Sequence, residues 1–297
     1  MKKRAFVRYS KQGKIVPGSL ILTGGSYPQG PATWKEVPAD LCCESPVTEP
    51  LIMEIIPDSD YYEFGFRVYN PNTVKGTIEW GDGTSEPFDL STSGGYTFFG
   101  HTYSTPDYIP QTVKVYFTSV VGFRNLEIGD EVWKTLSVSN LTKIFKNSTI
   151  QQIDADDSLL GSLDVHDIPI TQLYALNCPN LAYLNVQGCT SLDDVELFND
   201  AFETLDFSGC TAVSSLAIFN NPNLTTVIID DCPNITFLDV YDSILSSANI
   251  EYIITTLDNN GLSNGYLDLS GTNSSPSSAV EGNIISLGDK GWELYIN

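Results

Sequence analysis

A hydrophobic triplet that recurs every ten or eleven residues constrains the fold of this chain more than any other feature. In "LAYLNVQGC", Leu181, Leu184 and Val186 are followed by Cys189, and the same spacing starts again at Leu192. A repeat of this regularity indicates an architecture of stacked units. The units follow one another without a gap and begin at Ile150, Leu160, Ile170, Leu181, Leu192, Phe202, Val213, Leu224 and Ile235.

Each unit is predicted to be a short strand followed by a turn. Two apolar residues that are two positions apart share one face of a strand. The flanking segments "CPN", "GCTS", "NNPN" and "DCPN" are rich in turn-forming residues. One unit is too short to enclose an interior, so two units should make one coil of about 21 or 22 residues. Its two strands would lie on opposite sides of a flat apolar core.

The ninth position of each unit should form columns, because units two apart stack on the same side. One column holds Cys189, Cys210 and Cys232. A small polar group there can bond turn backbone that would otherwise be buried unsatisfied, and a thiol also packs as a small hydrophobe. We expect these cysteines to form a structural ladder of reduced thiols. The alternative is a disulfide or metal ladder: stacked neighbours lie ~4.8 Å apart, but three cysteines in one column cannot all pair, and no Cys-x-x-Cys or matching His is present for zinc. The other column reads Cys178, Asp200, Asn221 and Ser243.

The repeats resemble those of leucine-rich repeat proteins, in which Asn or Cys occupies this ninth position. The resemblance covers residues 123–297 and implies a β-solenoid, which we place at 122–245. The segment "SSANIEYIITTLDNNG" departs from the short period, because its apolar residues have helical spacing and Gly261 follows its end. A strand, a second helix and a last strand are predicted after it. Residues 246–297 should therefore form a small α/β C-terminal cap over the last coil.

Residues 51–121 show short alternating strands with turn signals between them, which predicts a β-sandwich. The segment "WGDGTSE" from Trp80, the later "GHTY" that ends at Tyr103 and the strand "VKVYFT" resemble a PKD-like immunoglobulin-type domain. The resemblance implies such a sandwich over residues 45–121. His101 of this motif is predicted to be a hydrogen-bonded structural residue. The fold class we expect for the whole chain is thus mainly β.

Charge is distributed unevenly along the chain. The sequence of 297 residues has 15 Lys and Arg against 37 Asp and Glu, a net charge of −22. Residues 1–44 hold seven basic and three acidic residues, or +4, which leaves −26 for residues 45–297. An acidic body is repelled by phosphates, so nucleic-acid binding is not expected. The basic segment is too short to fold alone. We interpret it as an anchor to an acidic partner, through Lys2, Lys3, Arg4, Arg8, Lys11 and Lys14.

One alternative accompanies this interpretation. The basic segment could simply flank a strand. No run of about 20 apolar residues is present, and the first residues lack the apolar core of a secretory signal. We therefore expect neither a membrane span nor a signal peptide.

Sequence motifs for catalysis are not found. The only histidines are His101 and His166, and the chain has no G-x-S-x-G, Walker A or H-E-x-x-H pattern. We therefore expect a protein that is not an enzyme and has no cofactor. Calcium at the acidic segments 154–157 or 230–231 is left open, although neither has the EF-hand spacing. The remaining acids recur at outward repeat positions and predict a solvated acidic face: Asp154, Glu196 and Asp239 in one column, Asp164 and Asp206 in the other.

An aromatic column is the candidate partner-binding stripe. Phe198, Phe219 and Tyr241 take the same position in successive coils. They could cover the edge of the core. We favour contact with a partner, because the L-x-L residues already fill the core.

Both resemblances point to modules that present binding surfaces. Their combination is similar to fibre, appendage or decoration proteins of tailed phages. That similarity implies a non-enzymatic virion protein, a homo-oligomer anchored to other virion proteins by residues 1–44, whose outer modules meet host proteins or glycans. This step is an analogy of folds. The alternatives are a bacterial cell-surface adhesin or glycan-binding protein and, less favoured by the missing motifs, an enzyme that acts on surface polysaccharide.

Overall fold

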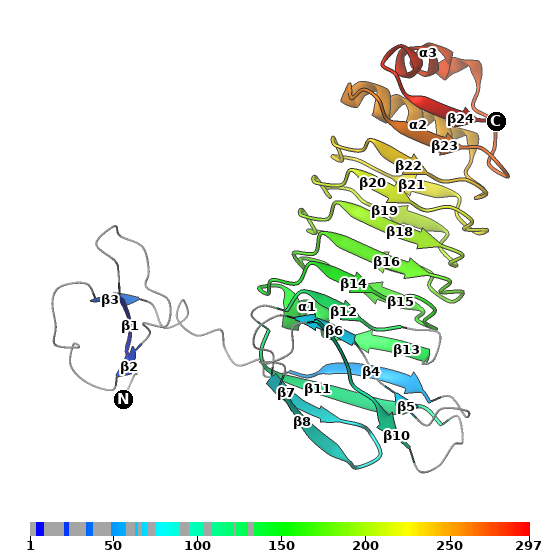
Figure 1. Ribbon diagram of the computed structural model, residues 1–297. Coiled ribbons are helices and arrows are strands. Elements are labelled where there is room, and N and C mark those ends of the chain that lie inside the picture. Colours follow the sequence, from blue (N-terminus) through cyan, green and yellow to red (C-terminus); the bar gives the residue numbers. More distant parts are fainter. Residues whose placement is uncertain are drawn as a thin grey trace. The chain divides into compact units, whose positions relative to one another are not determined.

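The structure is a computed structural model, and the chain in it is mainly β, as predicted (Figure 1). The chain divides into two compact units, Met1–Thr48 and Glu49–Asn297. Among the described residues, no helix is long and apolar enough to cross a membrane. The described residues are 4–8, 21–23, 34–37, 49–57, 63–64, 67–70, 75–89, 95–103, 109–120, 123–129 and 134–297.

The first unit holds a three-stranded antiparallel sheet in the order β2-β1-β3. Its strands are β1 (Arg4–Arg8), β2 (Ile21–Thr23) and β3 (Trp34–Val37). The predicted anchor residues Arg4 and Arg8 are the two ends of β1. Lys2, Lys3, Lys11 and Lys14 lie outside the described residues.

The second unit begins with a five-stranded antiparallel sheet in the order β13-β4-β11-β7-β8. Alternate residues of β4 are fully buried, at Leu51, Met53 and Ile55, so this sheet packs one face against a core. Strands β5 (Glu63–Phe64) and β10 (His101–Thr102) form a separate two-stranded antiparallel sheet. The strands of the five-stranded sheet are β4 (Leu51–Ile56), β7 (Lys75–Glu79), β8 (Ser85–Asp89), β11 (Gln111–Ser119) and β13 (Lys134–Ser139).

A ten-stranded sheet runs through the rest of the unit, in the order β24-β23-β22-β20-β18-β16-β14-β12-β6-β9. Its pairings are parallel from β12 to β24 and antiparallel at β6 and β9. The strands are β6 (Arg67–Asn70), β9 (Gly95–Phe98), β12 (Asn125–Glu127), β14 (Gln152–Asp154), β16 (Gln172–Leu176), β18 (Asp194–Phe198), β20 (Ser215–Ala217), β22 (Phe237–Asp239), β23 (Tyr266–Leu269) and β24 (Glu293–Ile296).

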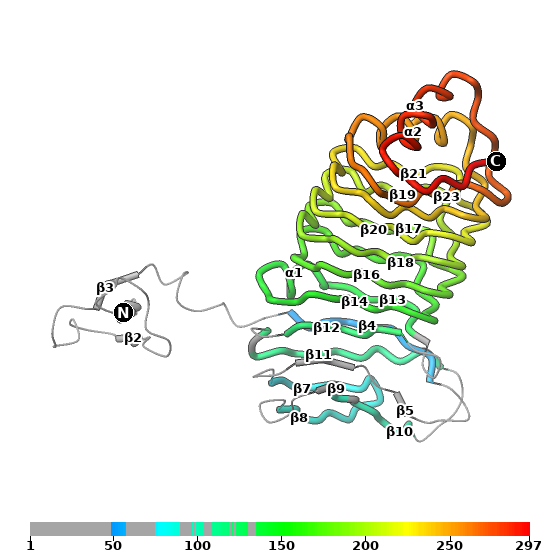
Figure 2. The backbone as a smooth tube through the Cα atoms, turned by 45° about the horizontal axis from the view of Figure 1, so that its top comes forward, coloured from blue at the N-terminus to red at the C-terminus, as the bar shows by residue number. Residues whose placement is uncertain are grey.

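The strands between these form two further parallel pairs, β15–β17 and β19–β21. Their bounds are β15 (Ser162–Asp164), β17 (Tyr183–Asn185), β19 (Thr204–Asp206) and β21 (Thr226–Ile228). Successive strands of the repeat therefore belong to different sheets. Each repeat strand of the ten-stranded sheet pairs with the one two units later, whereas on the other side the pairing is interrupted between β17 and β19. Figure 2 shows the coils stacked one on the next. The inward residues in register, Ile153, Leu173, Val195, Leu216 and Leu238, are all fully buried.

The repeats and the segment before them share one core. Strand β12 pairs with β6 on one side and with β14 on the other, so the ten-stranded sheet is continuous across this point. Phe117 of β11, Phe123 and Phe145 of α1 (Leu141–Phe145) pack their rings together at centroid distances of 4.9 to 5.8 Å. The ten-stranded sheet and this aromatic cluster thus combine residues from before and after the predicted boundary at 121/122, which stays a prediction.

The C-terminal segment contains the helix that its apolar spacing predicted. Helix α2 (Ser247–Asn260) begins after Ser246, whose side chain accepts from the Asn249 N–H, and ends at Gly261 with φ 72°. Asn249 replaces a strand partner: its side chain bonds both N–H and C=O of Val227 in β21. Strand β23, the 3₁₀ turn Ser278–Val280, α3 (Glu281–Asp289) and β24 complete the cap.

Candidate binding face

The outer face of the ten-stranded sheet carries in-register rows of outward side chains. Residues in the middle row face outward because their strand neighbours, such as Val195 and Leu197, are fully buried. From β18 to β24, the middle row reads Glu196, Ala217, Asp239, Asp268 and Tyr295. The row before it reads Asp194, Ser215, Phe237, Tyr266 and Glu293. We call these two rows, with Phe198, Phe219 and Tyr241, the aromatic–acidic face.

The carboxylates of this face repel one another. Partial burial and the neighbouring charge of Asp268 raise the pKa of Asp239, against a hydrogen bond from the Tyr241 N–H. Partial burial, followed by the charges of Asp194 and Asp154, raises the pKa of Glu196. Asp239 and Asp268 are direct neighbours in register, on strands ~4.8 Å apart. Asp239 and Glu196 are thus harder to ionise than in water, first because they are partly buried and second because negative charges lie beside them.

The chain supplies no Lys or Arg to this face from the repeats or the cap. Residues 134–297 are all described, and after Phe145 only Lys146 and Lys290 are basic. Lys146 pairs with Asp167 at 2.5 Å and Lys290 pairs with Asp258 at 2.6 Å. Neither Asp167 nor Asp258 belongs to the ten-stranded sheet. The acidic row therefore keeps its charge within this part of the molecule.

Aromatic rings flank the acidic row on both sides. Phe198 and Phe219 of the predicted stripe stack at 5.0 Å and 12°, and Tyr241, in the same position of the next coil, is 40% exposed. On the other side Phe237 and Tyr266 stack at 4.9 Å and 10°. The sequence analysis missed this second pair. It could have been found, because Phe237 precedes Asp239 by two residues and so shares its face.

The orientation of these rings limits what they can contact. In each pair, rings on neighbouring strands stack nearly face to face along the direction of the coils. One face of each ring is therefore covered by its partner, and these partly exposed rings contact solvent through the rest of their surface, including their edges. Each pair is an apolar strip, and whether the predicted stripe binds a partner stays a prediction.

The predicted cysteine ladder lies in the core, away from this face. Cys189 and Cys232 donate from Sγ to the carbonyls of Val165 and Phe207 in the preceding coil, each at 3.1 Å. Cys210 does the same to Val186 at 3.6 Å. Burial raises the pKa of each of the three thiols to about 12. Such thiols are poor nucleophiles, so the ladder has a structural arrangement.

The second column is a ladder of buried polar groups. Asn221 accepts from the Asp200 N–H and donates to the carbonyls of Leu197 and Ile218, at 2.9 to 3.0 Å. Asp200 accepts from the Cys178 N–H at 2.9 Å through Oδ1, while its buried Oδ2 has no hydrogen-bond partner. Burial is the main cause that raises the pKa of Asp200 to about 8. The carboxyl is therefore neutral at pH 7.

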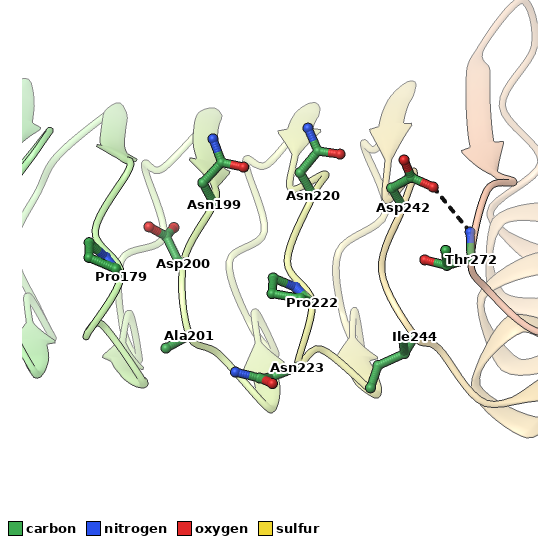
Figure 3. Close-up of a pocket in the computed structure, with 10 residues that line it drawn as sticks. All are labelled: Pro179, Asn199, Asp200, Ala201, Asn220, Pro222, Asn223, Asp242, Ile244 and Thr272. Atoms are coloured by element: carbon green, nitrogen blue, oxygen red, sulfur yellow. Dashed lines mark hydrogen bonds between the residues drawn. The ribbon is translucent and has the colours of Figure 1, made fainter.

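A groove of about 650 Å³ runs beside this ladder (Figure 3). It follows the turns at the ends of the sheet strands, where Asn199, Asn220 and Asp242 take positive φ at the same place in successive coils. Asp242 accepts from the Thr272 N–H at 3.2 Å, the dashed line in Figure 3. The groove is lined mainly by short polar and proline side chains, which offer amide donors and acceptors to a ligand.

His101 of β10 is held by its neighbours. His101 stacks on buried Trp80 at 5.0 Å and bonds Asp82 at 2.8 Å, while Tyr103 donates to the Trp80 carbonyl. Burial acts to raise the pKa of Asp82, but hydrogen bonds from Thr84 and His101 lower it to about 2. This cluster joins a turn to a strand and has the contacts of a structural element.

The acidic segments considered for calcium use their carboxylates in turns. Asp154 and Asp156 accept from the backbone N–H groups of Asp156 and Leu176, and Asp230 accepts from the Tyr252 hydroxyl. In the part of the chain that the structure describes, no group of three or more His, Cys, Asp or Glu residues could hold a metal ion.

Comparison with known proteins gave no match: no family model, no curated protein and no solved structure is similar to this chain.

Proposed function

We propose that this chain is a non-enzymatic structural and binding protein. In this proposal residues 45–121 are a PKD-like β-sandwich, residues 122–245 are a leucine-rich repeat solenoid with its cap at 246–297, and the aromatic–acidic face is the binding surface. The observation that carries it is the continuous ten-stranded sheet, which presents in-register rows of aromatic and acidic side chains on a rigid support.

The hydrogen bonds of the polar column support the leucine-rich repeat assignment. An amide at this position satisfies turn backbone of its own coil and the preceding one, as Asn221 does, and Asn273 repeats it at Leu245 and Val240. A coil of about 21 residues with Asn or Cys at this position is typical of such repeats.

The five-stranded antiparallel sheet and the antiparallel pair β5–β10 support the PKD-like assignment. The five-stranded sheet carries the "WGDGTSE" turn, where Asp82 bonds the N–H and hydroxyl of Thr84. The buried pair Trp80 and Tyr103 joins this turn to the later "GHTY" segment, with Tyr103 donating to the Trp80 carbonyl at 2.8 Å.

We place the protein on a tailed-phage virion, as a fibre, appendage or decoration protein. The basic residues 1–44 would anchor it to the particle, and the acidic second unit would project toward partners. Mass spectrometry of purified particles tests this placement, and the chain should be found in stoichiometric amounts. A truncated chain without residues 1–44 should be absent from particles assembled in its presence. Normal incorporation of the truncated chain would contradict the anchor, and absence of the full chain would contradict the virion assignment.

The groove favours a second candidate, a surface adhesin that binds a glycan. Its amides at Asn199, Asn220 and Asn223 could bond sugar hydroxyls. Binding to a glycan array that is lost in Asn220→Ala would favour this candidate over a purely structural role.

A further inference from the structure

We infer that the aromatic–acidic face binds a lysine- or arginine-rich segment of a partner protein. This inference rests on the proposed function and names the chemistry of the partner. It begins from charge complementarity: Glu196, Asp239 and Asp268 form a row on one sheet face, and the two basic residues after Phe145, Lys146 and Lys290, pair elsewhere. A cation brought to this row relieves the repulsion between neighbouring carboxylates.

The aromatic strips select the kind of cation. Phe198 with Phe219 lies on one side of the row, and Phe237 with Tyr266 lies on the other. Lys and Arg place their apolar stems along an apolar surface while the charged head reaches a polar one. The edges of the stacked rings supply that surface, and the carboxylates lie next to it. A metal ion or an ammonium ion would contact the acidic row but would gain nothing from the aromatic strips beside it.

The same geometry argues against a sugar at this face. Stacking on a sugar ring needs a free aromatic face, and in both pairs one face of each ring is already covered by its partner, at 4.9 and 5.0 Å. Ala217 leaves space in the row between Glu196 and Asp239 for a long side chain. A polypeptide that carries several Lys or Arg residues fits these features.

The experiment is a calorimetric titration at low salt, in which each of two short synthetic peptides is titrated separately into the full chain. One peptide alternates Arg with Ser, and the other has Gln in place of each Arg. We expect only the Arg peptide to bind. The double variant Asp239→Asn/Asp268→Asn should weaken its binding about tenfold, because two partly exposed ion pairs are lost. Asn retains the oxygen that accepts from the backbone N–H groups of Tyr241 and Ser270.

A matched control removes two charges elsewhere. Glu203 and Asp206 are exposed, and Asp206 belongs to β19, in a different sheet. Glu203→Gln/Asp206→Asn should change binding by less than about twofold. Phe219→Ala should weaken binding severalfold, and this loss should remain at higher salt because apolar contact is not screened. Circular dichroism confirms that each variant is folded.

Three outcomes would overturn the inference. The first is no binding of the Arg peptide. The second is an equal loss in both double variants, which would mean general attraction to a chain of charge −22. The third is self-association of the wild type that Asp239→Asn/Asp268→Asn abolishes, which would assign the face to the basic residues 1–44 of a second copy. Each leaves the particle experiment unaffected, so a chain found in virions that binds no cationic peptide loses this inference alone.

Discussion

At the scale of single residues, Asp200 occupies a place built for an amide. Asn221, one coil later, donates from Nδ2 to two backbone carbonyls. Asp200 has Oδ2 in place of that donor, and this buried oxygen has no hydrogen-bond partner. A protonated Oδ2 is a donor of the same kind. This explains how a carboxyl that is 2% exposed is tolerated in the ladder.

Asp200 should therefore make the protein less stable as pH rises. Its pKa is about 8 in the folded chain, against an ordinary value of 3.8. Between these values the folded state holds a proton that the unfolded state has lost, so the free energy of unfolding falls from about pH 4 to about pH 8. Asp200→Asn should remove this decline and raise stability at pH 7 by roughly 1–3 kcal/mol. Denaturant unfolding of both proteins at pH 5, 7 and 9 measures it, and parallel pH profiles would contradict the protonated carboxyl.

The thiol ladder makes a second prediction at this scale. Cys189, Cys210 and Cys232 are buried and donate to backbone carbonyls, so each needs its proton. We expect alkylation without reductant to leave all three unmodified in the native protein and to label all three in denaturant. Intact-mass measurement reads both states. A native disulfide at any of them would show that the column is a covalent ladder.

At the scale of elements, substitution by the same residue type should have very different effects on stability at two adjacent positions of one strand. Leu205 and Asp206 of β19 alternate between core and solvent: Leu205 is 1% exposed, and Asp206 is exposed. Leu205→Asn should cost roughly 3–5 kcal/mol, because it loses apolar burial and leaves an amide unsatisfied. Asp206→Asn should cost less than about 0.5 kcal/mol. Equal losses of melting temperature would reverse the assignment of faces.

The repeat made such strand-level predictions possible, because the inward residues of each coil recur at a fixed spacing and stacked coils have one register. Helix α2 was also predictable, since its cap residues and its buried residues Ile250, Ile253, Ile254 and Leu257 are local signals. Strand β8, with Pro87 and Glu86 among its residues, has weak strand propensity and was missed. Leu184, expected in the core, is only half-buried.

Long-range pairing is what the sequence could not reveal. The register of Val68 with Leu126 joins β6 to β12 across more than fifty residues, and nothing local specifies it. The stacking of Phe237 on Tyr266 depends on the cap placing β23 beside β22. The columns of the candidate site were therefore predictable within the repeat, whereas their extension into the cap was not.

At the scale of the whole second unit, the shared core should make the sandwich-like segment and the repeats unfold together. Repeat arrays can unfold piecewise, because each coil contacts only its neighbours. Here Phe117, Phe123 and Phe145 form one aromatic cluster where the two segments meet, and β12 bonds to both. Loosening either segment exposes apolar surface of the other, which couples them.

Phe123→Ala tests this coupling. The substitution should lower the free energy of unfolding by roughly 3–5 kcal/mol, because Phe123 is fully buried and its loss leaves a cavity. Native-state hydrogen exchange, read by mass spectrometry for peptides from β11 and from β23, should show the same loss of protection in both, although β23 lies beyond the last coil. Leu287→Ala, in the cap, is the control from the other end and should also lower protection in both. If each substitution affects only the peptides nearest to it, the second unit is a chain of weakly coupled coils, and the continuous sheet does not act as one cooperative body.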